Sequence, residues 1–397
     1  MSDSMEKEKF VLTKSFILLM AIICGVSVAN LYYIQPLESQ IVTTFSVSES
    51  SAGIAATVTQ IGYALGLLFI VPLGDICERR SLILKLLILI FLSLIATAFS
   101  QNYFFMLISM FIVGLTTIVP QVIVPYAAHL SPEEKRGKVI GDVMSGLLIG
   151  ILVSRVFSGI IGSIFNWRVV YIFASGFTIM LFIFVLKAFP KDNPVSNTSY
   201  IKLLKSIPGL IKNQMPLRES AINGFLMFGS FSIFWTSLIF MLETPIYNMG
   251  TKEAGLFGLF GISGALAAPL VGKVADKKSP RFTLGITILC STFAYICLAI
   301  FGNHIFGLII GAIFLDLGTQ GSQISDQAQV HSLGDEARSR NNTVFMFSYF
   351  AGGSTGSFLG TLCWQHFRWQ GVCTLGLIFE ALAIIFHFLI YRKPNMN

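Results

Sequence analysis

Long apolar windows, separated by short polar breaks, run along this chain from residue 15 to residue 391. A helix of roughly 20 apolar residues is long enough to span the hydrocarbon core of a bilayer. The charge-free run between Lys85 and Glu133 is divided by the polar break Ser100–Asn102, so one helix per window predicts twelve spans. They lie at about 15–37, 50–74, in the two parts of 86–132, and at about 139–164, 167–189, 220–243, 253–273, 281–301, 304–331, 341–365 and 371–391.

The apolar pattern is interrupted between residues 190 and 218, where five basic residues lie in one polar stretch. Its centre, 200–212, mixes aliphatic residues with lysines and predicts a short amphipathic helix on the membrane surface. Every span is expected to be helical, because lipid cannot satisfy free backbone polar groups, so the predicted fold class is all-α. Three parts are predicted: an N-terminal six-helix bundle at 1–189, a cytoplasmic linker at 190–218 and a C-terminal six-helix bundle at 219–397.

Composition supports lipid as the solvent of this chain. Hydrophobic residues make up 54% of the sequence and charged residues only 12%, and there are 36 Phe. Soluble domains usually carry about a quarter charged residues. A chain this apolar cannot keep so much greasy surface in water, so a soluble protein is excluded.

The basic residues predict an orientation in the membrane. The net charge is +7, and 23 of the 27 Lys and Arg fall on one side if both termini are cytoplasmic. Arg168, Lys252 and Arg368 fall on the other side, and Arg155 lies within a span. Cytoplasmic loops carry an excess of Lys and Arg, so the positive charge indicates orientation in a lipid bilayer and no nucleic-acid partner.

The two halves of the chain match at a fixed offset of 202 residues. The segment 129–136 aligns with 331–338, Gln121 with Gln323, and Trp167 with Trp369. Repeated six-helix halves are typical of secondary transporters, whose binding site lies near the midplane between the repeats.

The loop after the second span begins Gly74–Asp75 and ends Arg79–Arg80, and the second half repeats part of it at 272–277. With the segments 30–36, 315–318 and 338–343, this loop resembles the major facilitator superfamily, and within it the bacterial twelve-span drug/proton-antiporter-like branch. The sequence departs from the branch pattern at Ile76, Glu78, Met110 and Ile151. The resemblance implies two pseudo-symmetric six-helix bundles, and we expect a monomer in the bacterial inner membrane with both termini cytoplasmic.

The signature loop supplies a predicted gating motif. By the resemblance, Asp75 faces the start of the eleventh span near Asn341 and Asn342, where a carboxylate meets the positive end of a helix dipole. This contact is expected to close the cytoplasmic side, whereas Arg79 and Arg80 are equally well explained by loop anchoring. The predicted motif residues are Gly74, Asp75, Arg79, Arg80, Gly272 and Asp276.

Asp316 is the sharpest candidate, because it lies near the middle of the tenth span. A central Asp costs roughly 2.5–3.5 kcal/mol on insertion scales, so it is expected to face protein or water. Gln320, Gln323 and Gln327 follow at i+4, i+7 and i+11 on the same helical face. Asp316 is therefore predicted to bind the coupling proton or a cationic substrate group, with a structural tie to a neighbouring helix as the alternative.

Two further ionisable residues lie within spans and complete the proton-coupling candidates. Arg155 is followed by Ser158, Gly159 and Gly162, which predicts close approach of another helix on that face. A buried Arg needs a partner, and the candidates are Asp316, Glu243 or an anionic substrate. Glu380 lies in the twelfth span and is interpreted as a structural pairing or a minor proton site.

The resemblance places the substrate cavity among spans 1, 4, 7 and 10. Aromatic and amide side chains suit amphipathic organic molecules, although ordinary helix packing explains any one of them equally well. The predicted lining residues are Asn30, Tyr33, Gln60, Tyr63, Gln121, Trp235, Gln320, Gln323 and Tyr349.

These patterns favour a secondary transporter of a small-molecule substrate. A membrane enzyme needs clustered catalytic or metal ligands, and the five His are scattered without an HExxH motif, so no enzyme, metal or cofactor is expected. The sequence has no GxxxxGK[ST] motif, which would indicate that ATP drives transport, so protons are the simplest energy source. We predict proton-coupled efflux of amphipathic or drug-like compounds. The alternatives are uptake or export of a specific metabolite or siderophore and, as another class, a uniporter or channel.

Overall fold

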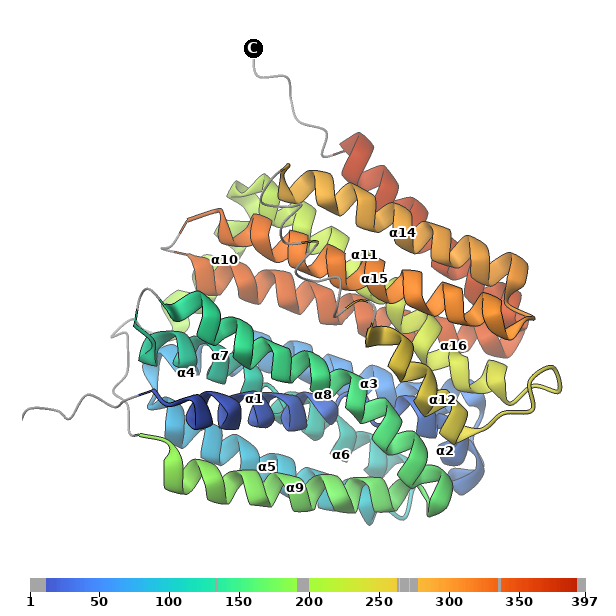
Figure 1. Cartoon of the computed structure of the whole chain (residues 1–397), viewed down its shortest axis with the longest axis horizontal. Helices are drawn as coiled ribbons and strands as arrows, with labels where there is room; N and C mark the ends of the chain where they lie inside the picture. The colour runs from blue at the N-terminus through green and yellow to red at the C-terminus, as the bar shows by residue number, and fades with distance from the viewer. Residues whose placement is uncertain are drawn as a thin grey trace, which may run out of the picture.

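The computed structural model describes residues 12–132, 135–190, 200–262, 264, 271, 278–334 and 337–390, and these described residues form helices and turns without a β-strand (Figure 1). The N-terminal half contains α1 (Lys14–Ala29), the 3₁₀ turn η1 (Gln35–Leu37), α2 (Glu38–Phe45), α3 (Glu49–Phe69), α4 (Leu73–Ile76), α5 (Arg79–Ala98), α6 (Tyr103–Thr116), α7 (Val119–Leu130), α8 (Arg136–Ile164) and α9 (Trp167–Ala188). The rest contains α10 (Tyr200–Asn213), α11 (Met215–Leu242), α12 (Thr251–Phe257), the 3₁₀ turn η3 (Gly258–Gly261), α14 (Pro280–Phe301), α15 (Ile305–His331), α16 (Arg338–Ile384) and the π-helical η4 (Ile385–Ile390).

Nine helices of the described residues are long and apolar enough to cross a membrane. Of the other predicted spans, the first is broken, since α1 covers only Lys14–Ala29 and the chain continues through η1 and α2. The eighth falls largely on residues outside the described part. The last two share α16, in which Arg368 has non-helical backbone angles with φ of 52°. A multi-span all-α membrane architecture is therefore confirmed, and the count of twelve stays a prediction.

The surface of the molecule is apolar where helices face outward. Phe306 is 74% exposed and Phe104 is 72% exposed. Many other large aliphatic and aromatic side chains on α5, α9 and α14 are also exposed, whereas Asp316 and Glu380 are buried. Water penalises such a surface and lipid does not, so this distribution is that of a bilayer protein.

The helices form two bundles that lie side by side (Figure 1). In the N-terminal bundle α1 packs on α8, α3 on α6 and α5 on α9, and in the C-terminal bundle α11 packs on α16 and α14 on α15. The bundles meet along two pairs of helices, α3 with α16 and α8 with α12. Anything bound between the bundles therefore contacts helices of both.

Local sequence explains where several helices begin. Ser48 accepts a hydrogen bond from the backbone N–H of Ser51 at 3.1 Å and caps α3. Asn102 accepts one from Phe105 at 2.8 Å and caps α6, so the polar break predicted at Ser100–Asn102 is a helix boundary. Short polar side chains favour this position because they satisfy the free N–H groups of the first turn.

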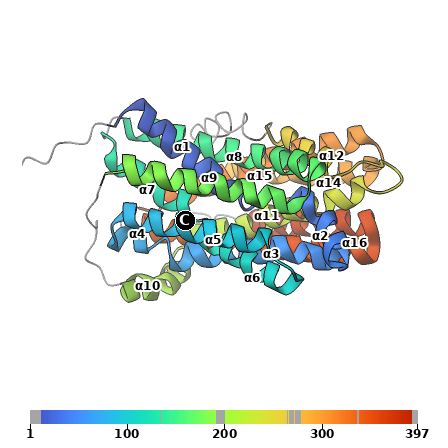
Figure 2. The same ribbon diagram turned by 90° about the horizontal axis from the view of Figure 1, so that it is seen from below.

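The linker contains the helix that the lysine-rich pattern predicts. The α10 helix lies at the end of the molecule that also holds α4 and α7 (Figures 1 and 2). The Tyr200 hydroxyl donates to the Phe69 carbonyl at 2.7 Å, and Arg340 donates to Ser206 at 2.7 Å. Since Phe69 ends α3 and Arg340 lies in the first turn of α16, this helix contacts both bundles.

Close packing of α11 on α16 depends on glycine, which leads to a stability prediction. A Cβ on Gly352 would lie 1.9 Å from the Phe225 carbonyl oxygen, whereas a Cβ on Gly176 of α9 meets no atom within 4 Å. Overpacking typically costs about 1–3 kcal/mol, so we expect Gly352→Ala to lower the free energy of unfolding by roughly that amount. The measurements are the unfolding temperature of the purified protein and its folded yield, which should both fall. Gly176→Ala is the matched control and is expected to be neutral or stabilising, because Ala favours helix. Equal behaviour of the two variants would contradict the close approach.

Candidate functional site

Arg155 is the centre of the interface between the bundles. Its side chain comes from α8 and is 1% exposed, and its Nε donates to Gln35 Oε1 at 2.7 Å. The guanidinium lies 4.0 Å from the ring centroid of Trp235 on α11, which is the distance of a cation–π contact. The rings of Tyr32 and Phe231 lie 5.1 Å and 5.4 Å from it. A charged side chain of one bundle is thus held by aromatic rings of both.

Glycines bring the backbone around Arg155 close to the second bundle. A Cβ on Gly255 would lie 2.5 Å from the Arg155 carbonyl oxygen and 2.7 Å from the Cα of Gly159. A Cβ on Gly258 would lie 2.9 Å from the Arg155 Cβ. The small residues that follow Arg155 in the sequence therefore pack against α12, as their spacing predicts.

Asp316 lies on α15 in the C-terminal bundle, and its side chain is 2% exposed. Arg155 and Asp316 interact electrostatically across the interface, although no ion pair within 4 Å joins them in the described part of the chain. A Cβ on Gly261 would lie 3.1 Å from Asp316 Oδ1, so η3 passes directly beside the carboxylate. Of the predicted partners of Arg155, Asp316 is its charged neighbour, whereas Glu243 ends α11 with an exposed side chain.

The polar face predicted for α15 faces α16 beyond Asp316. The Tyr349 hydroxyl lies 3.5 Å from Gln323 Oε1, and Gln327 Nε2 lies 3.7 Å from the Met346 sulfur. Gln320 packs beside Gly264, where a Cβ would lie 2.9 Å from the Gln320 Cγ. This face is therefore protein-facing rather than lipid-facing.

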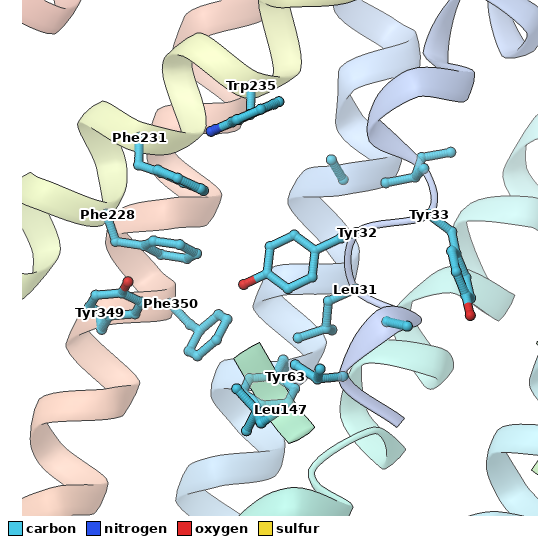
Figure 3. Packing of buried hydrophobic residues seen from close by; sticks show 14 of the residues in the cluster. Leu31, Tyr32, Tyr33, Tyr63, Leu147, Phe228, Phe231, Trp235, Tyr349 and Phe350 are labelled. Atoms are coloured by element: carbon cyan, nitrogen blue, oxygen red, sulfur yellow. The ribbon is translucent and has the colours of Figure 1, made fainter. Parts of the chain in front are cut away.

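An aromatic cluster lies between the bundles (Figure 3), and two of its rings, those of Tyr32 and Phe231, contact Arg155. Phe228 of α11 stacks on Tyr349 with ring centroids 4.0 Å apart. Tyr63 of α3 lies 4.3 Å from Phe350 of α16, so rings of the two bundles touch. The name aromatic cluster is used below for Tyr32, Tyr63, Phe228, Phe231, Tyr349 and Phe350.

Two predicted amide residues adjoin the aromatic cluster. Gln121 donates to the Tyr63 hydroxyl at 3.3 Å, and Gln60 donates to Ser357 of the other bundle at 3.2 Å. Tyr33 points away from the C-terminal bundle in Figure 3 and packs against Phe157, 5.9 Å between ring centroids. Asn30 is buried at the end of α1.

Further buried carboxylates of the C-terminal bundle include Glu380 and Asp326. Glu380 accepts a hydrogen bond from Ser230 at 2.5 Å, and the Tyr295 hydroxyl donates to the Ser230 carbonyl. Asp326 accepts from Asn223 at 2.9 Å and is 0% exposed. Sequence reasoning missed Asp326, although a second Asp within the same apolar window was the available signal.

One end of the interface is closed by direct contacts between the bundles, called here the Glu49 closure. Glu49 Oε2 accepts from Trp364 Nε1 and from Arg368 Nη1, each at 3.0 Å. Gly53 packs on Thr361 so closely that a Cβ would lie 2.3 Å from the threonine methyl carbon. On the α8 side, Gln40 donates to the Gly162 carbonyl at 2.8 Å and to Thr251 at 3.3 Å. Its residues are Gln40, Glu49, Gly53, Gly159, Gly162, Thr251, Gly255, Thr361, Trp364 and Arg368.

The ionic part of the Glu49 closure is predicted to contribute little. The Arg368 and Glu49 side chains are 67% and 33% exposed, and exposed ion pairs contribute only about 0–1 kcal/mol. We expect Glu49→Gln to raise the labelling rate of Thr361→Cys by a membrane-impermeant thiol reagent, in a background without native cysteines, by about fivefold or less. Glu253→Gln is the control, because that carboxylate bonds only the Gly250 N–H of its own helix start in the described contacts. High salt should bring wild type toward Glu49→Gln, and a rate independent of both salt and substitution would refute the prediction.

The predicted gating motif is only partly described. Arg79 Nε donates to the Gly74 carbonyl at 3.1 Å, and Arg80 donates to the Leu186 carbonyl at 2.7 Å. The first contact lies within the α4–α5 turn, and the second ties this turn to the end of α9 in the N-terminal bundle. The Asp75 side chain, Gly272 and Asp276 lie outside the described residues.

A small cavity of about 10 Å³ lies beside the Arg155 guanidinium and has room for one water-sized group. The residues that line it come from η1, α8, α11 and α12. They are Gln35, Pro36, Arg155, Trp235, Leu238, Ile239 and Ala254.

Two helical bundles that enclose charged and aromatic side chains between apolar outer faces define a membrane transport protein rather than an enzyme. The family model of the Major Facilitator Superfamily matches residues 17–326 and 220–397, and the chain belongs to this superfamily. The family predicted from the sequence is thereby confirmed, and the drug/proton-antiporter branch stays a prediction.

Known proteins similar to the chain are transporters. A putative uncharacterized transporter of Escherichia coli K12, YgaY, is 39% identical over 96% of this chain and 97% of its own length. A probable sugar efflux transporter of Mannheimia succiniciproducens is 25% identical over 90% of this chain and 89% of its own length. The crystal structure of a D-xylose–proton symporter superposes with a TM-score of 0.79 at 15% identity and covers 96% of this chain and 98% of that one, which shows a shared fold.

Proposed function

We propose that the chain is a proton-coupled secondary transporter that moves a small organic solute across the bacterial cytoplasmic membrane. Transporters of the superfamily work by alternating access, in which two bundles rock about a central site. We also propose twelve crossings with both termini cytoplasmic. In this proposal the broken first helix and the predicted eighth span are two crossings beyond the nine long helices. The third arises because the turn at Arg368 divides α16 into two crossings.

The observation that carries this proposal is the pair of opposite charges between the bundles. Arg155 belongs to the N-terminal bundle and Asp316 to the C-terminal one, and both are almost fully buried. Ionisable groups at membrane depth are expensive, and they mark substrate and ion pathways. A charge pair that only stabilised a bundle would not need to join the two parts that move.

Asp316 is the proposed proton site. The charged and titratable groups that face it are Arg155 of α8, Tyr32 before η1 and Tyr349 of α16. Proton binding removes the negative charge and with it the attraction to Arg155. Protonation therefore changes how strongly one bundle is held to the other at the centre of the interface.

With cytoplasmic termini, the Glu49 closure lies on the outer side of the membrane. The described conformation is then one in which the outer ends of α3 and α8 are packed on α16 and α12. Alternating access requires these contacts to separate in the opposite state. The glycine contacts suit this role, because they hold two helices together without interlocking side chains.

Two substrate classes are supported, each by a different observation. The aromatic cluster supports the predicted export of amphipathic compounds, and a relative is named a probable sugar efflux transporter. A specific metabolite is favoured instead by the buried guanidinium, which an uncharged drug-like molecule does not need.

Reconstitution tests the proposed function. The purified chain is placed in sealed vesicles, and solutes of neutral, cationic and anionic classes are offered with and without an imposed pH gradient. We expect at least one solute to accumulate only with the gradient and to be released by a protonophore. Movement that ignores the gradient would favour a uniporter, and the absence of movement for every class would reject the proposal.

A further inference from the structure

Three of the residues that line the cavity beside Arg155 carry buried hydrogen-bond donors without partners, and the other lining residues are apolar. Arg155 Nη1 and Nη2 and Gln35 Nε2 are buried and make no hydrogen bond in the structure. Trp235 Nε1 is also buried without a partner at hydrogen-bond distance, and it faces the Asp316 carboxylate. Asp316 Oδ2 is a buried acceptor without a partner at hydrogen-bond distance. Buried polar groups are almost always paired, so this set of atoms needs an explanation.

The arrangement of the donors fits one kind of ligand. A guanidinium presents two terminal N–H groups in a planar fork that matches the two oxygens of a carboxylate. Gln35 fixes the Nε side of that plane, and Trp235 stacks on its face, so both terminal nitrogens stay available. A single positive charge with Asp316 nearby favours a monoanion over a phosphate dianion.

We propose that the transported solute carries a carboxylate group, which binds Arg155 Nη1 and Nη2 between the bundles while its organic body contacts the aromatic cluster. The inference rests on the proposed transport function and names the substrate class of that same site. Gln35 Nε2 and Trp235 Nε1 are the further donors to this carboxylate.

The sign of the coupling to protons follows from the charges. An ionised Asp316 attracts Arg155 and repels a carboxylate ligand, whereas a protonated Asp316 does neither. Proton binding at Asp316 therefore favours ligand binding, and by linkage the ligand favours proton binding to the same extent. Solute and proton then move in the same direction, which with an inward proton gradient is uptake.

Ligand binding is tested on the purified full-length protein by the rise in unfolding temperature with four probes that share a ring body. They are benzoate, its amide benzamide, benzylammonium and phenyl phosphate. We expect benzoate to stabilise the protein, hexanoate to act as a second carboxylate, and the other three probes to give no shift. Equal shifts with benzamide, benzylammonium or phenyl phosphate, or no shift with either carboxylate, would overturn the assignment.

Variants locate the site. Arg155→Gln is expected to abolish the benzoate shift, and Gln35→Glu gives the same loss while it keeps the acceptor that holds Arg155 Nε. Trp235→Phe keeps the ring and removes one donor, which is expected to weaken benzoate binding about tenfold. Lys252→Gln removes an exposed positive charge and serves as the control. Benzoate binding that survives both Arg155→Gln and Gln35→Glu rules out this site.

The pH dependence separates the coupling from the binding. Benzoate affinity is expected to increase as pH falls and to become strong and independent of pH in Asp316→Asn. Affinity that increases with pH would contradict the shared direction of solute and proton. If neutral or cationic solutes alone follow the pH gradient in vesicles, the carboxylate inference fails and the proposed function stands. If no solute of any class moves, the proposed function itself fails.

Discussion

Asp316→Asn is expected to abolish solute accumulation driven by a pH gradient while leaving exchange of the same solute without a gradient. Asn keeps the size and hydrogen-bonding capacity of the side chain but cannot bind or release the coupling proton. Accumulation in sealed vesicles should fall to the level without a gradient, a loss of about tenfold or more if the proton gradient supplies 1.4 kcal/mol. The measurement is the internal solute concentration at steady state.

Two further variants make this expectation sharp. Asp142→Asn removes one exposed carboxylate of α8 and should behave as wild type. Glu380→Gln tests the other predicted proton site, which bonds Ser230 inside the C-terminal bundle. Full gradient-driven accumulation by Asp316→Asn would exclude Asp316 as the proton site, and loss in Glu380→Gln alone would move it there.

Gly255→Val is expected to stop transport by preventing the outer closure. A Cβ at this position meets the Arg155 carbonyl oxygen at 2.5 Å, and valine adds two methyl groups where α8 and α12 touch. If keeping the bundles apart costs 1–3 kcal/mol, as overpacking does, the closed population and the transport rate should fall roughly tenfold. Vesicle transport gives the rate, and labelling of Thr361→Cys from outside reports the opened state.

The control for this variant is Gly141→Val, because a Cβ on Gly141 of the same α8 meets no atom within 4 Å. It should fold and transport as wild type. A Gly255→Val protein that is folded and transports normally, with unchanged labelling at Thr361→Cys, would show that α8 and α12 need not approach each other in the cycle.

The fold follows from the sequence wherever lipid is the only constraint. Apolar windows predict α5, α9 and α14, since exposed backbone in lipid leaves helix as the sole choice. The breaks within windows are harder to predict. The interruption between α1 and α2 lies inside a predicted span and is marked only by Pro36, whereas the turn at Arg368 falls in the break predicted between the last two spans.

The charged residues of the site could be predicted from the sequence, whereas its uncharged residues could be predicted less well. Asp316 and Arg155 are conspicuous because an ionisable residue at membrane depth has few favourable surroundings. Tyr32, Gln35 and Phe231 are ordinary residues in apolar segments, and nothing in the local pattern tells which way they face. Tyr33 is predicted for the cavity, but it is its neighbour Tyr32 that contacts Arg155. Both residues lie in the turn between α1 and η1, where helical periodicity does not tell which way a side chain points.

Arg155 belongs both to the central site and to the contacts that close the outer end of the interface. Its guanidinium touches Trp235, and its carbonyl lies against Gly255 at the closure. Separation of α8 from α12 therefore also draws the charge away from Phe231 and Trp235, the aromatic neighbours of the C-terminal bundle. A solute that holds the guanidinium against α11 links the two bundles. Solute binding and the separation of α8 from α12 are then coupled to each other. Such a link would suppress conformational cycling without solute, because different contacts hold the bundles together in the unloaded and the loaded transporter.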